Sequence, residues 1–120
     1  MMSETTSTFD SVLDLCRHQH RRIVLGLLTA ERRSLTLNDL TKTVLAYNHQ
    51  ASPMEVSRDV LSEIRLSLHH CHLPKLASDG LVTYDPDQQL VDPTEQFEQA
   101  EPTLATVLDA DPTLETPIEL

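Results

Sequence analysis

The sequence predicts a small, mainly α-helical domain that carries one β-hairpin. Apolar residues recur at spacings of three and four over most of the first 80 residues, which is the period of amphipathic helices. After Gly80 the pattern changes to a short β-favouring run, Leu81–Tyr84, then an Asp-Pro-Asp turn and a return run at Gln89–Val91. A length of 120 residues suits one domain with a single core.

Three helices and a short strand are expected ahead of the longest helix. Each helix is predicted by apolar residues on one face, and the strand by a brief β-favouring segment. Their expected bounds are Phe9–Cys16, His20–Thr29, a strand at Ser34–Thr36, and a helix from a cap at Thr36 or Asn38 to about Tyr47.

A longer helical pattern begins at Met54 and runs to Ala77, where Gly80 is placed to end it. Pro74 lies inside this run. It has no N–H to donate and its ring crowds the carbonyl of residue 70, so a kink or break is expected there. The alternative is two helices that meet near residues 64–68.

The predicted order is helix, helix, short strand, helix, long helix and hairpin. This is the plan of a winged helix-turn-helix domain, in which the hairpin forms the wing. We expect a disordered N-terminus at residues 1–7, the winged-helix domain at 8–92, and an acidic C-terminal extension at 93–120. Within the extension, apolar residues predict a weak helix at about 95–109, followed by disorder.

Charge divides the chain into two unlike parts. Residues 1–80 hold all nine Lys and Arg together with nine acidic residues, whereas residues 81–120 hold ten acidic residues and no base. The acidic part could dock on a basic partner, or it could be a solvated segment that maintains solubility. We favour solubility, because the excess of Arg over Lys and the many Asp and Thr resemble proteins of salt-loving archaea, whose surfaces are generally acidic.

Several classes of protein are excluded by what the sequence lacks. The longest apolar stretch is residues 23–28, far short of the roughly 20 residues that cross a bilayer, and no secretory signal is evident, so we expect a cytoplasmic protein without membrane contact. Cys16 and Cys71 are too few for a disulfide scaffold. Because neither a Gly-rich phosphate loop nor a recognisable nucleophile pattern is present, we expect no enzyme activity and no cofactor.

The segment His72–Val82 resembles the end of the recognition helix in many bacterial and archaeal winged-helix repressors. There, Leu73 and Leu76 would anchor the helix, Gly80 would permit the turn, and the next two residues would open the wing. A closer resemblance is to an uncharacterised group of small winged-helix-like domains of halophilic archaea. It covers roughly residues 8–92 and rests on the segments His20-Arg21-Arg22, His70-Cys71-His72-Leu73-Pro74-Lys75-Leu76 and Asp79-Gly80-Leu81-Val82-Thr83-Tyr84-Asp85. This resemblance implies a fold and no particular activity.

The leading hypothesis is a transcriptional regulator that binds duplex DNA as a homodimer. The candidate DNA contacts are Arg58, Arg65, Ser67, His69, His70, Lys75 and Ser78, and further contacts to the phosphate backbone could come from Arg32, Arg33 and Lys42. The helix is poor in basic residues and the wing tip carries Asp85 and Asp87, which would repel phosphate. The alternative is a protein-interaction or dimerisation module that keeps the winged-helix fold without binding DNA.

The histidines raise the possibility of a metal site. His69 and His72 are spaced i, i+3 and share a helix face, but a structural zinc site needs four ligands, and His18 and His20 would have to come from another helix. We therefore expect no metal site. His70 or His72 is instead expected to pack where the long helix meets the hairpin and to donate to a backbone carbonyl.

Overall fold

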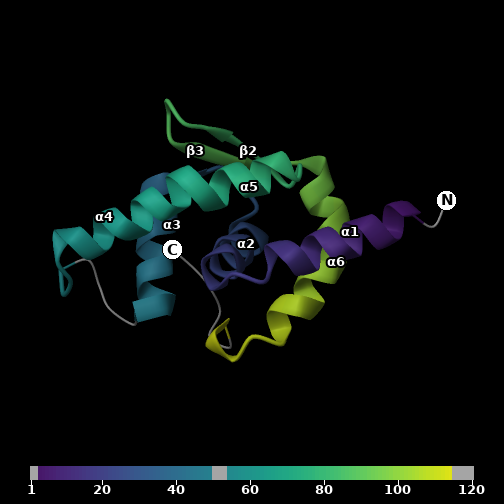
Figure 1. Cartoon of the computed structure of the whole chain (residues 1–120), viewed down its shortest axis with the longest axis horizontal. Helices are drawn as coiled ribbons and strands as arrows, with labels where there is room; N and C mark the ends of the chain where they lie inside the picture. The colour runs from purple at the N-terminus through teal and green to yellow at the C-terminus, as the bar shows by residue number, and fades with distance from the viewer. Residues whose placement is uncertain (1–2, 50–53, 115–120) are drawn as a thin grey trace.

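The computed structural model describes residues 3–49 and 54–114, which form a mainly helical fold with a small three-stranded antiparallel sheet (Figure 1). The regular elements are α1 (Ser3–Leu15), α2 (Gln19–Glu31), β1 (Leu35–Thr36), α3 (Leu37–Val44), α4 (Arg58–Ser67), α5 (Leu73–Ser78), β2 (Val82–Asp85), β3 (Leu90–Pro93) and α6 (Glu95–Asp109). Two π-helical turns, η1 (Leu45–His49) and η2 (Leu68–His72), extend α3 and α4, and a 3-10 turn, η3 (Pro112–Leu114), follows α6.

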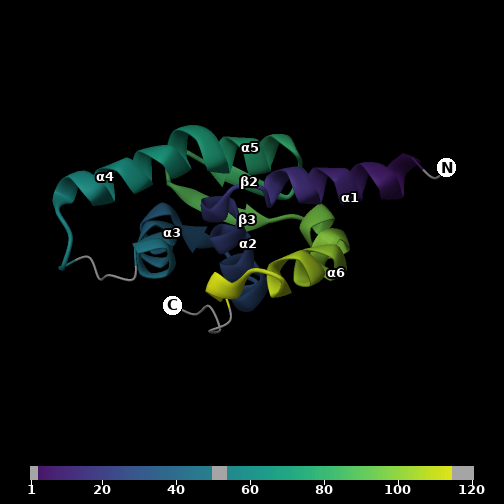
Figure 2. The ribbon, with the colours of Figure 1, turned by 60° about the horizontal axis from the view of Figure 1, so that its bottom comes forward.

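Helix α2 lies at the centre of the molecule. The long helical run through α4 and α5 passes along one side of it and α6 along the other (Figure 2). Ile23, Leu27 and Leu28 are fully buried, which matches the apolar face that the sequence predicts for this helix, and Leu25 is buried as well. Burying each such side chain contributes roughly 2 kcal/mol relative to leaving it in water. The burial of α2 therefore makes a large contribution to the stability of the core.

The chain stays helical from Arg58 to Ser78, across the position where a kink or break is expected. The π-helical turn η2 lies immediately before Pro74, and the N–H of Leu73 donates to the carbonyl of Leu68, five residues back. One extra residue in this turn accommodates the proline, whose missing N–H would otherwise interrupt the α-helical ladder. Pro74 then occupies the first turn of α5, where no N–H is needed.

The three strands form a sheet in the order β1-β3-β2. The short strand predicted at residues 34–36 is confirmed as an edge strand, with Leu35 opposite Val91. The predicted hairpin is also present, with each strand displaced by about one residue, and Tyr84 opposite Val91. In the turn, Oδ1 of Asp85 accepts hydrogen bonds from the backbone N–H groups of residues 87 and 88, which closes the tip.

The two ends of the described chain differ most from the expectation. Helix α1 begins at Ser3, within the segment expected to be disordered. Helix α6 occupies the predicted range, but it packs against α1 and α2 in the common core, where Phe97 and Leu104 are fully buried. Asp111 is buried as well, within the predicted disordered end, and residues 115–120 lie outside the described residues.

Candidate functional site

The long helical run from Arg58 to Ser78 carries the side chains that the sequence predicts to contact DNA, and the structure distributes them along its whole length. Arg58 is exposed in the first turn of α4. Arg65 lies about two turns further along α4. It is half-buried, and its Nη2 donates to Oε1 of Gln89 at the hairpin. Lys75 lies in α5, at the end that faces α1. The predicted contacts therefore have different surroundings: Arg65 is bonded to the hairpin, and Lys75 faces α1.

Lys75 is engaged by carboxylates of its own chain. Its Nζ lies 3.5 Å from Oδ2 of Asp14 on α1 and 3.7 Å from Oδ1 of Asp79. Ser78 is exposed at the same end of the helix, next to Asp79. A phosphate group approaching this end would meet two carboxylates beside one ammonium group, so this end is unsuited to an anion.

The middle of the long helix is fastened to the hairpin. Nδ1 of His69 lies 2.6 Å from Oη of Tyr84 on β2. Burial raises the pKa of Tyr84, so the phenol keeps its proton and can donate it to the imidazole. Ser67 is half-buried and His70 is exposed nearby. His69 thus holds the hairpin against the helix, and its Nδ1 is directed to the protein itself.

Most cations of the chain are matched by acidic groups. The ion pairs in the described residues join Arg17 to Asp14, Arg22 to Asp111, Arg32 to Glu101, Arg33 to Glu31, and Lys75 to Asp14 and Asp79. Within those residues, Lys42, Arg58 and Arg65 are the exposed or half-exposed cations that have no carboxylate at ion-pair distance, and Arg21 is buried. The unneutralised positive charge therefore gathers on α3 and α4.

A cavity of about 140 Å³ lies between α3 and α4. Two of these cations line it together with three polar residues and one leucine. The lining residues are Asn38, Thr41 and Lys42 from α3, and Leu61, Ser62 and Arg65 from α4. Sequence reasoning named Lys42 and Arg65 but missed Asn38, Thr41 and Ser62, because the residues come together through helix packing and not through spacing in the chain. We call these six residues together with Arg58 the α3–α4 cationic surface.

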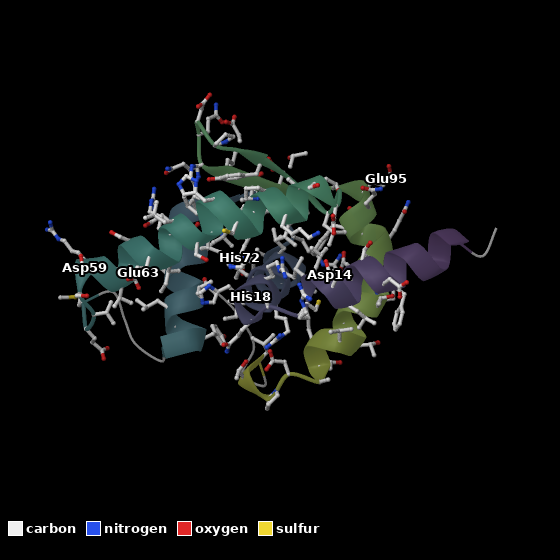
Figure 3. The ribbon with its side chains drawn as sticks, in the orientation of Figure 1. Asp14, His18, Asp59, Glu63, His72 and Glu95 are labelled. Atoms are coloured by element: carbon white, nitrogen blue, oxygen red, sulfur yellow. The ribbon has the colours of Figure 1, made fainter. Side chains whose placement is uncertain are left out.

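Acidic residues border the α3–α4 cationic surface. Asp59 and Glu63 are exposed on α4 and project outwards from the helix (Figure 3). Asp85 and Asp87 are exposed at the hairpin tip, as the sequence predicts. The cationic surface is therefore narrow, and an anionic ligand that binds there has to avoid these carboxylates.

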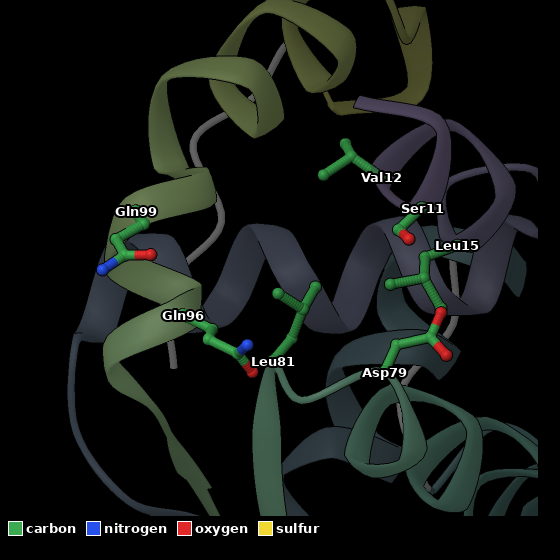
Figure 4. Close-up of a pocket in the computed structure, with 7 residues that line it drawn as sticks. All are labelled: Ser11, Val12, Leu15, Asp79, Leu81, Gln96 and Gln99. Carbon is green, nitrogen blue, oxygen red and sulfur yellow. The ribbon is translucent and has the colours of Figure 1, made fainter. Parts of the chain in front are cut away.

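A second cavity, of about 190 Å³, lies where α1, α6 and the start of β2 meet (Figure 4). It is lined by Ser11, Val12, Leu15, Asp79, Leu81, Gln96 and Gln99. Its one carboxylate, Asp79, lies 3.7 Å from the ammonium of Lys75. One ion-paired carboxylate among neutral amides and a hydroxyl supplies no pair of titratable groups for acid–base chemistry.

The residues of the motif around 72–84 have structural roles. Leu73 and Leu76 are fully buried, as expected for anchors of the helix. Gly80 has φ +85, and a Cβ placed there would meet the side-chain amide of Gln96. The left-handed backbone favours glycine, whereas the Gln96 amide is the end of a flexible side chain, so the backbone conformation is the reason that Gly80 occupies the turn into the hairpin.

The arrangement of the histidines differs from the expectation. His72 is buried, and its ring contacts that of His18, with ring centroids 4.2 Å apart (Figure 3). His20 completes a three-ring cluster, 5.2 Å from His18 and 5.6 Å from His72. His69 and His72, which share a helix face by spacing, have different partners, since Nδ1 of His69 faces Tyr84. The start of α2 supplies the two partners that sequence spacing could not place.

No helix within residues 3–49 and 54–114 is both long and apolar enough to cross a membrane. The sequence matches a family described as a domain of unknown function (DUF7344) over residues 13–92. No curated protein and no solved structure matches the chain. The matched segment extends from α1 into β3 and includes α2, the α3–α4 cationic surface and all three histidines of the cluster. Because the match covers well over half of the chain, the protein belongs to the DUF7344 family.

Proposed function

We propose that the chain is a winged-helix domain that binds duplex DNA through α3 and α4. Support for the fold comes from the position of each strand: β1 lies between α2 and α3 in the chain and pairs with β3, and the β2–β3 hairpin follows the long helix. In that plan, α3 and the α4–α5 run correspond to the helix-turn-helix pair, and the hairpin corresponds to the wing.

The observation that carries the proposal is the set of unneutralised cations on α3 and α4, two of which, Lys42 and Arg65, line one cavity. Lys42, Arg58 and Arg65 have no carboxylate at ion-pair distance in the described residues, whereas the exposed cations elsewhere are paired. Asn38 and Ser62 are exposed and add neutral donors beside them, whereas the hydroxyl of Thr41 donates to the carbonyl of Leu37. Lys, Arg, Asn, Thr and Ser are the side chains that hold DNA phosphates and fix the register of a protein on the duplex.

The same surface limits what the protein reads. The exposed residues of α4 include Asp59, Glu63 and Leu66, and none of these is a bidentate donor to a base edge. We therefore propose that backbone phosphates dominate the affinity and that sequence preference is modest. Affinity of this kind falls steeply as salt rises, since binding releases counterions from the DNA.

The direct experiment is fluorescence anisotropy of labelled duplexes from the source genome, titrated with the full chain over a series of KCl concentrations. Circular dichroism at each concentration confirms that the protein stays folded. With three cationic contacts, log K is expected to fall against log salt with a slope of about −3. Absence of binding at the lowest salt concentration that preserves the fold would rule the proposal out.

A second candidate, dimerisation, is favoured by a different observation. Phe9 and Leu13 are 49% and 44% exposed and lie one turn apart on the same face of α1. A second copy of this chain could cover the face, which would also place two DNA-binding surfaces in one particle. Replacing both residues with Ser should convert a dimer into a monomer in light scattering. A wild-type chain that is already monomeric at high concentration would contradict dimerisation and leave the DNA proposal standing.

A further inference from the structure

We infer that His18, His20 and His72 form a binding site for a divalent transition-metal ion of the zinc class. One ring nitrogen from each residue lies within 4.8 Å of the corresponding nitrogens of the other two. Tetrahedral coordination at a Zn–N distance of about 2.05 Å places ligand nitrogens about 3.3 Å apart. Small side-chain rotations therefore suffice to bring the three nitrogens around one ion. The inference is independent of DNA binding, because none of the three residues belongs to the α3–α4 cationic surface.

The buried member of the cluster has a ring nitrogen that no hydrogen bond occupies within the described part of the chain. His72 is 6% exposed, and its Nδ1 is buried without a hydrogen-bond partner among the described residues. A buried polar atom without a partner costs free energy in the core, and coordination through this nitrogen would remove that cost.

The two other histidines come from the start of α2 and leave the site open on one side. His18 is exposed and His20 is half-buried. Three imidazoles with an open fourth position are the ligand set of zinc sites that keep a water molecule. Imidazole nitrogen suits Zn²⁺, Cu²⁺ and Ni²⁺, whereas Mg²⁺ and Ca²⁺ require oxygen ligands. The cluster is consequently expected to bind Zn²⁺, Cu²⁺ or Ni²⁺ in preference to Mg²⁺ or Ca²⁺.

Two features of the site reduce its affinity. Nδ1 of His18 caps α2 by accepting a 3.2 Å hydrogen bond from the N–H of His20, and metal coordination requires this exposed bond to break or weaken. The charge of Arg22 is matched by Asp111, but Arg21 is buried beside the cluster and its Nη2 donates to the backbone carbonyl of Asp14 at 3.4 Å. Its positive charge repels a bound cation. Replacing Arg21 with a neutral residue should therefore strengthen metal binding.

A bound ion would connect the beginning of α2 to the long helix at η2. These segments are more than 50 residues apart in the chain, and they meet beside the π-helical turn that accommodates Pro74. Coordination would stabilise the folded state by mass action, since the separated ligands of the unfolded chain hold the ion much less strongly.

The test is calorimetric titration of the full chain with Zn²⁺, with Mg²⁺ as the control ion, and visible absorption after loading with Co²⁺. One Zn²⁺ per chain is expected, with a Kd below about 0.1 mM, together with an absorption band of tetrahedral Co²⁺ and a raised Tm. His18→Asn preserves a capping side chain while removing a ligand, and it should weaken binding at least tenfold. His72→Asn should do the same.

The matched control is His69→Asn/His70→Asn, which removes two histidines of the same helix that lie outside the cluster and should leave Zn²⁺ affinity unchanged. Arg21→Gln should tighten binding, a direction that structural damage would not produce. If His72→Asn does not fold, His18→Asn and Arg21→Gln decide the question. The inference is overturned if Zn²⁺ does not bind, or if the control variant loses binding while His18→Asn retains it.

Discussion

Nε of Arg22 donates a 2.7 Å hydrogen bond to Oδ2 of Asp111, and this bond joins the central helix α2 to the residue that follows the C-terminal helix. Oδ1 of the same carboxylate accepts hydrogen bonds from the N–H and hydroxyl of Thr113, at 2.9 and 2.7 Å. Nη1 of Arg22 donates to the carbonyl of Cys16 at 2.7 Å. The network satisfies a buried carboxylate and fixes the end of the described chain against the core.

Asp111→Asn should destabilise the protein by about 2 kcal/mol, because it removes a charge-assisted bond and leaves Arg22 without its acidic partner. The change is measured as a lowered midpoint of urea unfolding. Asp109→Asn, at an exposed position two residues earlier, is the matched control and should shift the midpoint little. Equal effects of the two substitutions would show that the Arg22–Asp111 bond contributes nothing specific.

The same carboxylate makes stability depend on pH in the acid range. Burial raises the pKa of Asp111, but hydrogen bonds from Arg22 and Thr113 outweigh burial, and the net pKa is below its ordinary value of 3.8. The unfolded state therefore binds the proton more readily, so this contribution is complete above pH 3.8 and is lost as pH falls through the lower folded pKa. Wild type and Asp111→Asn should converge in free energy of unfolding at the acid end of a pH series. A difference that stays constant below pH 3.8 would contradict the assignment.

Gly80→Ala should destabilise the protein by about 1–2 kcal/mol, since an alanine at φ +85 is strained. The new Cβ also displaces the amide of Gln96. Gln96→Ala in the same chain should recover the steric part of the loss and leave the backbone part. Thermal unfolding of both variants separates the two terms, and full recovery in the double variant would show that backbone strain at residue 80 is negligible.

Neutralising the acidic groups beside the α3–α4 cationic surface should strengthen DNA binding. Asp59→Asn/Glu63→Gln is expected to raise affinity about 3- to 10-fold at low salt, with the gain shrinking as salt screens the charges. Glu95→Gln/Glu98→Gln changes net charge equally at exposed positions in α6 and serves as the control. Anisotropy titrations decide it: an equal gain in the control would mean that net charge, and not this surface, governs binding.

The sequence predicted the order of the elements because apolar residues at helical spacing, such as Ile64 and Leu68, indicate each helix from a short stretch of chain. The sequence also predicted the range of α6, but it did not predict that one face of this helix is buried in the core. The acidic composition of residues 81–120 indicated a solvated extension, whereas Phe97 and Leu104 are core residues. An acidic exposed face and a buried apolar face coexist on one helix, and average composition cannot separate them.

The candidate sites were less accessible to sequence reasoning, since each depends on which side chains meet across helices. Lys75 is a basic residue of the predicted recognition helix and was a candidate DNA contact, yet it is paired with Asp14 from α1. His72 was matched with His69 by helical spacing, although its neighbours are His18 and His20. Helical periodicity orders residues within one helix, and it does not determine which helix packs opposite.

The salt dependence of DNA affinity in two charge-matched double variants tests the proposed function most directly. Lys42→Gln/Arg58→Gln removes two exposed cations of the α3–α4 cationic surface, whereas Arg17→Gln/Arg33→Gln removes two exposed cations that are paired with Asp14 and Glu31. The first variant should lower the magnitude of the slope of log K against log salt by about 2, and the second should leave it near the wild-type value. Equal slopes in the two variants would contradict the account.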